Sequence, residues 1–397
     1  MSVKRRLGFL TAAPRISTRL DAEMSGPRSR VLGLMKAFQT LDWEVKPFIV
    51  GDRTPKKWSD KGSGEAISKG FWRTLAVDLV RIGLGLFNSV KSWRELGKEV
   101  DWVYEYAATL QCLGWIFQRQ GIPWILQTEA LLYYEAKAER KALVLDGIAK
   151  KLELWSYQQC DVLACVSSTL KEVLVNELNI PTEKIVLVPN GVDTEFLNPE
   201  LHQPKRLFSG FTIGFVGSLY GWAGLDLLLE ALKDLKEEGC QLFLVVVGDG
   251  EMKLAWEKQS QDLGLSNQVT FVGRVCWEQV PQYIAGFDLG YSGQIQLQIG
   301  KMYLSPMKLY EYMSMAKPVV ASAFEDAQRL VREEETGFLF RPEDKEELKS
   351  ALVKALAARD RLSQMGDKAR QEIVANHNWT SRVETLVKEV ELILASK

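Results

Sequence analysis

Short apolar runs bounded by turn-forming residues recur along the whole chain and constrain its fold more than any other feature. The first series is Leu7–Leu10, Val45–Val50, Trp102–Tyr106, Trp124–Gln127, Val162–Val166 and Lys184–Val188. The second series is Thr212–Val216, Leu242–Val247, Val269–Val272, Leu289–Ser292, Pro318–Ser322 and Gly337–Phe340. Most runs are continuous rather than alternating, which is typical of parallel strands covered on both faces. Helical periodicity between the runs completes the pattern and predicts an α/β fold with two Rossmann-like domains.

The boundary between these domains is predicted from a break in the pattern. Residues 196–210 contain two prolines and show no periodicity, as expected of a linker. We therefore expect an N-terminal domain over residues 1–197, a linker over 198–210 and a C-terminal domain over 211–375. A last helix, 376–397, is expected to cross back to the N-terminal domain. Open α/β sheets bind ligands beyond the carboxyl ends of their strands, so the region between the domains is the expected site.

Composition excludes several classes of function. The formal net charge of −1 gives no global attraction for nucleic acid. The five cysteines lack metal-ligand spacing and are predicted to be free buried thiols in a reducing compartment. With only two histidines, His202 and His377, a histidine-ligated metal or a Ser-His-Asp mechanism is disfavoured. The N-terminus is predicted to be a strand rather than a signal peptide, and no run reaches the ~18 apolar residues of a membrane span.

Residues 70–94 do not fit the count of a simple Rossmann domain. Apolar residues from Trp72 to Val90 recur at helical spacing, whereas most charged residues fall elsewhere on the helical wheel. Two interpretations remain open: a membrane-surface helix with a basic polar side, or a long helix packed on the N-terminal domain. Arg73, Asp78 and Arg81 exclude a spanning helix.

Three strand-to-helix junctions in the second half could bind an anion. Gly217 follows the strand Thr212–Val216, and the run Val245–Gly250 ends in a similar turn; glycines there let backbone amides approach a phosphate. Neither junction has the dinucleotide fingerprint, and the chain has no phosphate-binding loop of the GxxxxGK[ST] type, which disfavours dehydrogenases and kinases.

The third junction is the stretch SPMKLYEYMSMAKPVVAS, residues 305–322. Ser305 and Pro306 are good helix-start residues. Lys308 and Glu311 are three residues apart and share a helix face. The lysine could meet a phosphate and the carboxylate could accept hydrogen bonds from ribose hydroxyls. A surface Lys–Glu pair without function is the alternative.

The order of several motifs resembles that of the family 4 retaining glycosyltransferases, which have the GT-B fold. The C-terminal motifs are GFVGSLYGWAGLDLLLEAL, VVVGDGEM, VTFVGRVCWEQVPQYIAGFDLGYS, SPMKLYEYMSMAKPVVAS and EETGFLFRPED. The N-terminal ones are VYEYAATLQCLGWIFQRQGIPWILQTEA, DVLACVSSTLKEVL and KIVLVPNGVDTEFLNP. The resemblance covers nearly the whole chain and implies an acceptor domain followed by a donor domain.

The resemblance implies a donor site in the C-terminal domain. The base of a nucleotide-sugar would lie against the backbone around Gly273 and Arg274, and Glu311 matches the second glutamate of a paired-glutamate motif, which would hold the ribose. The diphosphate would lie by the first phosphate turn. Residues expected around the donor are Gly217, Ser218, Tyr303, Ser305, Pro306, Met307 and Lys308.

In the N-terminal domain, Gly26-Pro27-Arg28 occupies the place of a glycine-rich loop that reaches across to the donor. Thr128-Glu129 occupies the position near the reacting sugar where many relatives have histidine. The resemblance therefore implies that Lys308, Glu129 and Arg28 are the catalytic residues.

Four departures separate this chain from the family pattern. Tyr303 replaces the first glutamate of the pair, and Ser218 and Ala223 replace the usual arginine and lysine. Glu325-Asp326 replaces a Gly-Gly turn. Since charge-assisted contacts are the strong ones, a cation must compensate. Lys308 is the candidate; Lys301, Arg274 and Arg329 are reserves.

The implied activity is hexosyl transfer from a nucleotide-sugar with retention of configuration, in polysaccharide assembly or a related process. No metal or other cofactor is expected, because helix N-termini and Lys308 could stabilise the leaving diphosphate. The expected partners are the donor and a glycan, lipid-linked or small-molecule acceptor, with no nucleic acid. The expected location is cytoplasmic, with contact at the membrane surface if residues 70–94 dock there. The alternative is an inactive GT-B subunit that binds nucleotide and supports a partner glycosyltransferase. An epimerase would need an acid/base pair, and no convincing one is found.

Overall fold

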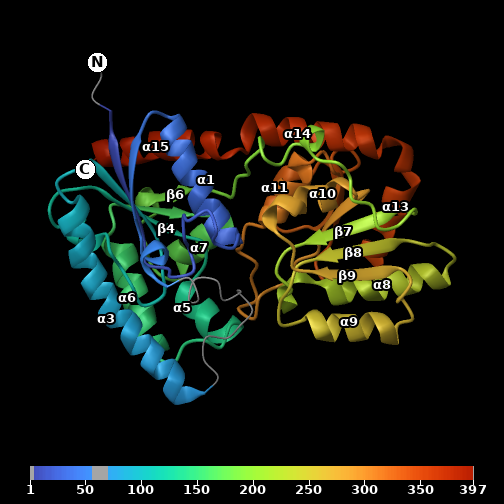
Figure 1. The fold of residues 1–397 in the computed structure, drawn as a ribbon, viewed down its shortest axis with the longest axis horizontal. Helices are drawn as coiled ribbons and strands as arrows, with labels where there is room; N and C mark the ends of the chain where they lie inside the picture. Colours follow the sequence, from blue (N-terminus) through green and yellow to red (C-terminus); the bar gives the residue numbers. More distant parts are fainter. Residues whose placement is uncertain (1–3, 56–69, 397) are drawn as a thin grey trace.

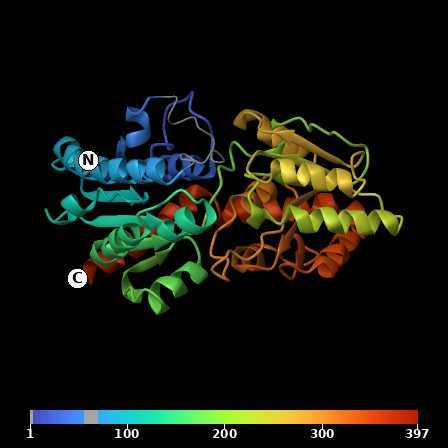
Figure 2. The same ribbon diagram turned by 90° about the horizontal axis from the view of Figure 1, so that it is seen from below.

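The computed structural model describes residues 4–55 and 70–396, which form two α/β lobes side by side (Figures 1 and 2). Each lobe is built on a six-stranded sheet whose strands pair in parallel. Every apolar run of the sequence pattern holds one of these strands. The predicted fold class, two Rossmann-like domains, is confirmed.

The N-terminal sheet has the strand order β2-β1-β3-β4-β5-β6. Its strands are β1 (Arg6–Thr11), β2 (Glu44–Ile49), β3 (Trp102–Tyr106), β4 (Trp124–Thr128), β5 (Val162–Cys165) and β6 (Ile185–Leu187). The helices of this half are α1 (Gly26–Thr40), α3 (Phe71–Leu96), α4 (Trp115–Gln118), α5 (Leu132–Tyr134), α6 (Asp146–Gln159) and α7 (Ser168–Asn176). Side chains of the sheet contribute to two apolar clusters, which explains why its strands carry continuous apolar runs.

The C-terminal sheet has the order β12-β11-β10-β7-β8-β9. Its strands are β7 (Thr212–Val216), β8 (Phe243–Val247), β9 (Val269–Gly273), β10 (Leu289–Ser292), β11 (Val319–Ser322) and β12 (Gly337–Phe340). Its helices are α8 (Leu225–Glu237), α9 (Lys253–Asp262), α10 (Val280–Ala285), α11 (Met307–Ser314), α12 (Glu325–Leu330), α13 (Lys345–Ala357) and α14 (Leu362–Asn376). In both lobes the strand order reverses next to the first strand, where such sheets bind ligands.

The last helix, α15 (Trp379–Ala395), packs on the N-terminal lobe although it follows the C-terminal one (Figure 1). Asn378 caps its start by accepting a hydrogen bond from the Ser381 amide at 2.9 Å. Its buried face, which includes Trp379 and Val383, joins the same apolar cluster as residues of β1 and α1. The chain therefore crosses between the lobes twice, once at the linker and once before α15.

Two further observations bear on the sequence predictions. Cys112, Cys160 and Cys165 are buried, as predicted, but Cys276 is exposed and Cys240 only half-buried. Cys276 lies in the loop after β9, outside the continuous apolar runs, so the prediction of burial was wrong for it. Over residues 4–55 and 70–396, no helix combines the length and the apolarity needed to cross a bilayer.

Candidate active site

The N-termini of α1 and α11 meet where the two lobes join. A Cβ atom placed on Gly26, the first residue of α1, would lie 3.5 Å from the Met307 sulfur at the start of α11. Ser25 caps α1 by accepting a hydrogen bond from the Arg28 amide at 3.4 Å. Helix N-termini present unpaired amides and a partial positive charge, so this junction favours an anionic ligand.

Lys308 extends from the first turn of α11 toward the turn that follows β7. Its Nζ lies 4.2 Å above the ring centroid of Phe215, and a Cβ on Gly217 would be 3.5 Å from its Cε. Burial lowers the pKa of Lys308 to about 8, and Glu311 partly opposes the shift. Within residues 4–55 and 70–396, the structure shows no salt bridge to Lys308. It is a desolvated cation held by a π face rather than by a carboxylate.

Glu311 lies one turn further along α11 and is 8% exposed. Burial raises the pKa of Glu311 to about 7, while Lys308 acts in the opposite direction. The helix is held against β7 by the Val216 amide, which donates to the Tyr312 hydroxyl at 2.7 Å. Lys308 and Glu311 are therefore fixed relative to the Gly217 turn, as a site that binds a ribosyl diphosphate requires.

The turns after β7 and β8 pack backbone against backbone. Gly217 has φ +144° and Gly248 has φ +145°, and a Cβ on Gly248 would lie 1.9 Å from the Gly217 carbonyl oxygen. The Gly217 amide donates to Val247 O at 3.0 Å. Only glycine fits at these two positions, which lets the two turns pack closely against each other.

The three reserve cations are all neutralised by carboxylates. Arg274 pairs with Glu23 at 2.7 Å, Lys301 with Glu177 at 2.5 Å and Arg329 with Glu325 at 3.8 Å. The first two pairs join the C-terminal lobe to the N-terminal lobe. This distribution favours Lys308 as the cation available to a ligand.

Two of the departures from the family pattern, Ala223 and Tyr303, have structural roles. Ala223 is 2% exposed within the core of the C-terminal lobe, where a lysine would have to be buried, whereas Ser218 is exposed beside the Gly217 turn. Tyr303 is 1% exposed and packs in the core cluster of the N-terminal lobe, with its carbonyl accepting from Ser167 Oγ at 2.6 Å. Ala223 and Tyr303 therefore serve packing within and between the lobes, whereas Ser218 is left at the surface.

Glu325 connects the lobes directly, and Asp326 supports the contact through Ser305. The Glu325 carboxylate accepts from the amides of Ser168 and Thr169, at 2.7 and 2.8 Å, at the N-terminus of α7. Asp326 accepts hydrogen bonds from the hydroxyls of Ser305 and Tyr310. The sequence pattern identified this substitution but not its function as a contact between lobes.

Ser305 is part of the same contact. The Asn190 amide group donates to Ser305 O at 2.7 Å, and the Asn190 backbone N–H donates to Ser305 Oγ at 3.2 Å. Pro306 directly precedes α11 as its N-cap residue. Asn190 was missed by sequence reasoning, because nothing in its local pattern indicates a contact with residues more than a hundred positions away.

In the N-terminal lobe, Glu129 follows β4 and belongs to a buried polar network. Its carboxylate lies 3.1 Å from Nε of Arg30, a fully buried residue, and accepts from the Tyr106 hydroxyl at 2.5 Å. Arg30 also donates to Asn190 Oδ1 and to Val188 O. Glu129 is thus held in one orientation, and Arg30 is a positioning residue that the sequence analysis missed. Thr128 bonds to Ala130 O at 2.7 Å and to the Tyr157 hydroxyl.

Arg28 is bonded to the backbone rather than left available as a catalytic cation. Its guanidinium donates to the carbonyls of Ser17, Ala22 and Arg19 at 2.7, 2.9 and 2.7 Å. Burial lowers the pKa of Arg28. Arg28 therefore shapes the loop before α1, and a contact with the donor stays a prediction.

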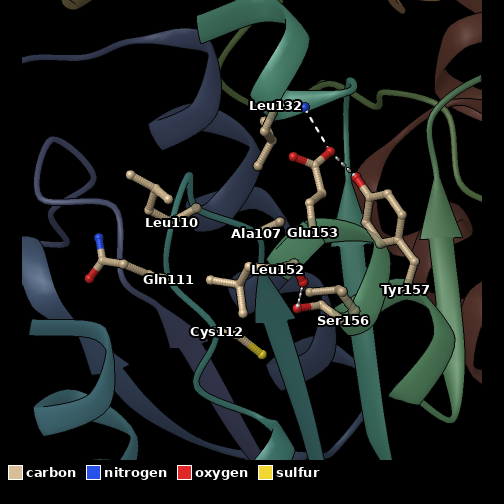
Figure 3. A pocket seen from close by; sticks show the side chains of 11 residues that line it. Ala107, Leu110, Gln111, Cys112, Leu132, Leu152, Glu153, Ser156 and Tyr157 are labelled. Atoms are coloured by element: carbon tan, nitrogen blue, oxygen red, sulfur yellow. Dashed lines mark hydrogen bonds between the residues drawn. The ribbon is translucent and has the colours of Figure 1, made fainter. Parts of the chain in front are cut away.

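A small cavity lies inside the N-terminal lobe (Figure 3). Its volume is about 20 Å³, enough for a water molecule but not for a sugar ring. Glu153 lines it and accepts from the Leu132 amide and the Tyr157 hydroxyl, at 2.8 and 2.6 Å. Burial raises the pKa of Glu153 to about 7. This cavity is an internal void rather than an acceptor site.

Comparisons with known proteins agree with this architecture. The model of the Glycosyltransferase Family 4 matches residues 25–196, and that of Glycosyl transferases group 1 matches residues 200–372. The chain is 26% identical over 321 residues to the UDP-Gal:alpha-D-GlcNAc-diphosphoundecaprenol alpha-1,3-galactosyltransferase of Escherichia coli, covering 76% of this chain and 79% of that protein. Alignments with two other curated relatives span only 60% and 58% of those proteins' lengths.

Solved structures show the same fold over the whole chain. The sucrose-phosphate synthase of Thermosynechococcus elongatus superposes with a TM-score of 0.72 at 17% identity, covering 99% of this chain and 100% of that one. Anabaena HepE in complex with UDP and glucose superposes with a TM-score of 0.62 at 16% identity, covering 98% and 99%. The chain therefore belongs to the family 4 glycosyltransferases of the group 1 type and has their two-domain GT-B fold.

Proposed function

We propose that this protein transfers a hexose from a nucleotide-sugar to a glycan, lipid-linked or small-molecule acceptor, with retention of anomeric configuration and without a metal ion. The observation that carries the proposal is the position of Lys308, a desolvated cation without a carboxylate partner in the described residues, beside the Gly217 turn. Such a cation at a helix N-terminus stabilises charge that develops on a departing diphosphate. A cytoplasmic location with attachment at the membrane surface belongs to the same proposal.

Each residue then has a defined role. Lys308 and the N-terminus of α11 bind the diphosphate, and Glu311 accepts hydrogen bonds from the ribose hydroxyls. Gly26, at the start of α1, brings the N-terminal lobe against the donor. Glu129, oriented by Arg30 and Tyr106, lies on the N-terminal side, where the reacting sugar would be held.

The reaction needs no strong base from the protein. The bond between the anomeric carbon and the phosphate oxygen breaks, and the acceptor oxygen forms its bond to the same face of that carbon. The acceptor proton passes to the departing diphosphate oxygen. Lys308 lowers the barrier because its charge meets the negative charge that grows on that oxygen.

Relatives guide the choice of ligands for a first experiment. One named relative uses UDP-galactose and a diphosphoundecaprenol-linked sugar, and a structural neighbour holds UDP and glucose. We would screen UDP- and GDP-sugars by thermal shift, where a ligand at 100 times its dissociation constant raises stability by about 2.7 kcal/mol. NMR of the released or transferred sugar then reports the anomeric configuration.

The outcomes separate the proposal from its alternatives. Slow donor hydrolysis that yields first the α-anomer from an α-linked donor supports a retaining transferase. Inversion, or a requirement for added metal after chelation, contradicts that part of the mechanism. Tight nucleotide binding with no hydrolysis or transfer of any nucleotide-sugar would instead indicate the inactive subunit.

A further inference from the structure

Helix α3 reverses the usual arrangement of a surface helix, because it buries polar side chains and exposes large apolar ones. The face turned toward the lobe buries polar or small residues, among them Thr74, Asp78, Asn88, Ser89 and Ser92. The face turned outward carries large apolar side chains. The most exposed are Phe71, Trp72, Leu79, Val80, Leu84, Leu86, Phe87 and Val90, from 41% to 78% exposed. The helix lies at the outer edge of the N-terminal lobe (Figure 1).

Hydrogen bonds to the polar face fix the rotation of α3. The fully buried Asp78 accepts from the amides of Val144 and Leu145, at 2.8 and 3.1 Å, and pairs with Arg81 at 3.1 Å. Turning the helix to hide its apolar stripe would break both hydrogen bonds from these amides, each worth about 2 kcal/mol because the acceptor is charged. The exposed apolar face is therefore a stable feature of the fold.

A second anchor fixes the middle of the helix. The Ser89 hydroxyl donates to Cys112 O at 2.7 Å and accepts from Trp115 Nε1 at 3.2 Å. A Cβ on Gly85 would lie 3.3 Å from the side chain of Gln111, so the helix packs closely on the loop after β3. This loop leaves the carboxyl end of the sheet, the edge at which open α/β sheets bind ligands.

The charges on α3 complement an anionic surface. Arg73 and Lys91 border the apolar stripe, and Lys91 Nζ lies 5.9 Å from the Phe87 ring centroid. The two acidic residues of the helix do not oppose them, because Asp78 is buried and Glu95 pairs with Arg53 at 2.5 Å. A second copy packed on the same face would place its own Arg73 and Lys91 near those of the first copy, and these like charges would repel. A bilayer with anionic lipids matches both features, because its acyl chains receive the apolar stripe and its headgroups attract the basic border.

We propose that α3 docks flat on a bilayer that contains anionic lipids, with its apolar face at the boundary between headgroups and acyl chains. This inference adds to the proposed function a docking surface and a class of lipid. It does not depend on which sugar is transferred. Docking would hold the carboxyl edge of the N-terminal sheet next to the membrane.

The test is co-sedimentation of the full chain with vesicles of phosphatidylcholine alone or with added phosphatidylglycerol. We expect the unaltered protein to pellet with the anionic vesicles and to be released by high salt. The variant Trp72→Gln, Leu79→Gln, Phe87→Gln should lose at least about tenfold in partition coefficient, because three large apolar side chains no longer leave water. The variant Arg73→Gln, Lys91→Gln should lose the preference for phosphatidylglycerol.

A matched control removes the same number of exposed apolar side chains elsewhere. Leu254, Val353 and Leu392, on α9, α13 and α15, are 78%, 46% and 59% exposed, and their change to glutamine should leave pelleting unaltered. Equal pelleting of the unaltered protein and the α3 variant would overturn the proposal. So would a change in oligomeric state on altering α3 with no change in vesicle binding, which would indicate a second copy as the partner. Circular dichroism and donor hydrolysis without vesicles distinguish misfolding or a wrong assignment of activity from loss of docking.

Discussion

Lys308 Nζ lies 4.2 Å from the centroid of the Phe215 ring, whereas Arg274, Lys301 and Arg329 each lie within 4 Å of a carboxylate. An aromatic face partly compensates a desolvated ammonium group, but it leaves the charge open to an anion. Phe215 lies near the carboxyl end of β7, so its ring holds the lysine beside the Gly217 turn. The proposed donor site therefore depends on one helix-borne cation.

Lys308→Ala should lower kcat about 10²- to 10³-fold, the usual effect of removing one group that stabilises transition-state charge. The affinity for the nucleoside part should change less, because Glu311 remains. Steady-state kinetics with the preferred donor measures both. Lys317→Ala is the matched control, because burial lowers the pKa of Lys317 too, but it precedes β11 at the opposite end of the sheet. Unchanged turnover in Lys308→Ala would remove the assignment.

Binding of a nucleoside diphosphate should weaken as the pH rises above 8. The pKa of free Lys308 is lowered to about 8 by burial, and only the protonated lysine attracts the ligand. Above that pH, affinity should fall by up to tenfold per pH unit. Isothermal titration calorimetry from pH 6 to 9.5 measures this profile. Lys308→Arg should bind with little pH dependence, since arginine stays charged; an equally steep loss in that variant would point to another group.

Glu311→Gln should raise stability above neutral pH while weakening donor binding. Burial raises the pKa of Glu311 from 4.5 to about 7, so the folded state favours the protonated form. Its ionisation destabilises the fold as pH rises through about 7, by on the order of 3 kcal/mol at most. We expect a higher Tm for the variant at pH 8 and nearly equal values at pH 4. A lower Tm at pH 8 would show that the carboxylate stabilises the fold.

Glu325→Ala should weaken the contact between the lobes. The carboxylate accepts from two amides and two hydroxyls at the N-terminus of α7. Each charge-assisted hydrogen bond of this kind contributes about 2 kcal/mol. Differential scanning calorimetry should show a broadened transition or two transitions in place of one. Glu335→Ala removes an exposed partner of Arg332 and should leave the profile unaltered. A single unchanged transition in Glu325→Ala would contradict this role.

The sheets could be predicted because their cause is local. The run Thr212–Val216 is mostly apolar, and the structure buries all five residues between helices. The orientation of α3 could not be predicted in the same way. Periodicity shows that Trp72 and Asp78 lie on different faces, but not which face turns inward. That choice depends on amides at Val144 and Leu145, which lie more than sixty residues away.

The candidate site shows the same division. Lys308 and Glu311 could be placed together from their spacing on one helix. The pairing of Arg274 with Glu23 could not, because it joins loops from different lobes. Ala223 appeared as a lost cation, yet the structure buries it in the core. Long-range contacts determine which charges stay available, and a single sequence does not contain them.

The second passage of the chain between the lobes limits how they can move. Val192, which precedes the linker, forms an isolated bridge to Asn378, and Arg382 donates to Asn190 O at 3.1 Å. Both covalent connections are thereby joined at one place. Any opening of the lobes has to be a swing about that place rather than a sliding motion. Removing the last helix would take Trp379 out of the N-terminal core and would also remove the second connection between the lobes. We therefore expect that the two lobes of this enzyme cannot be separated into independently stable halves.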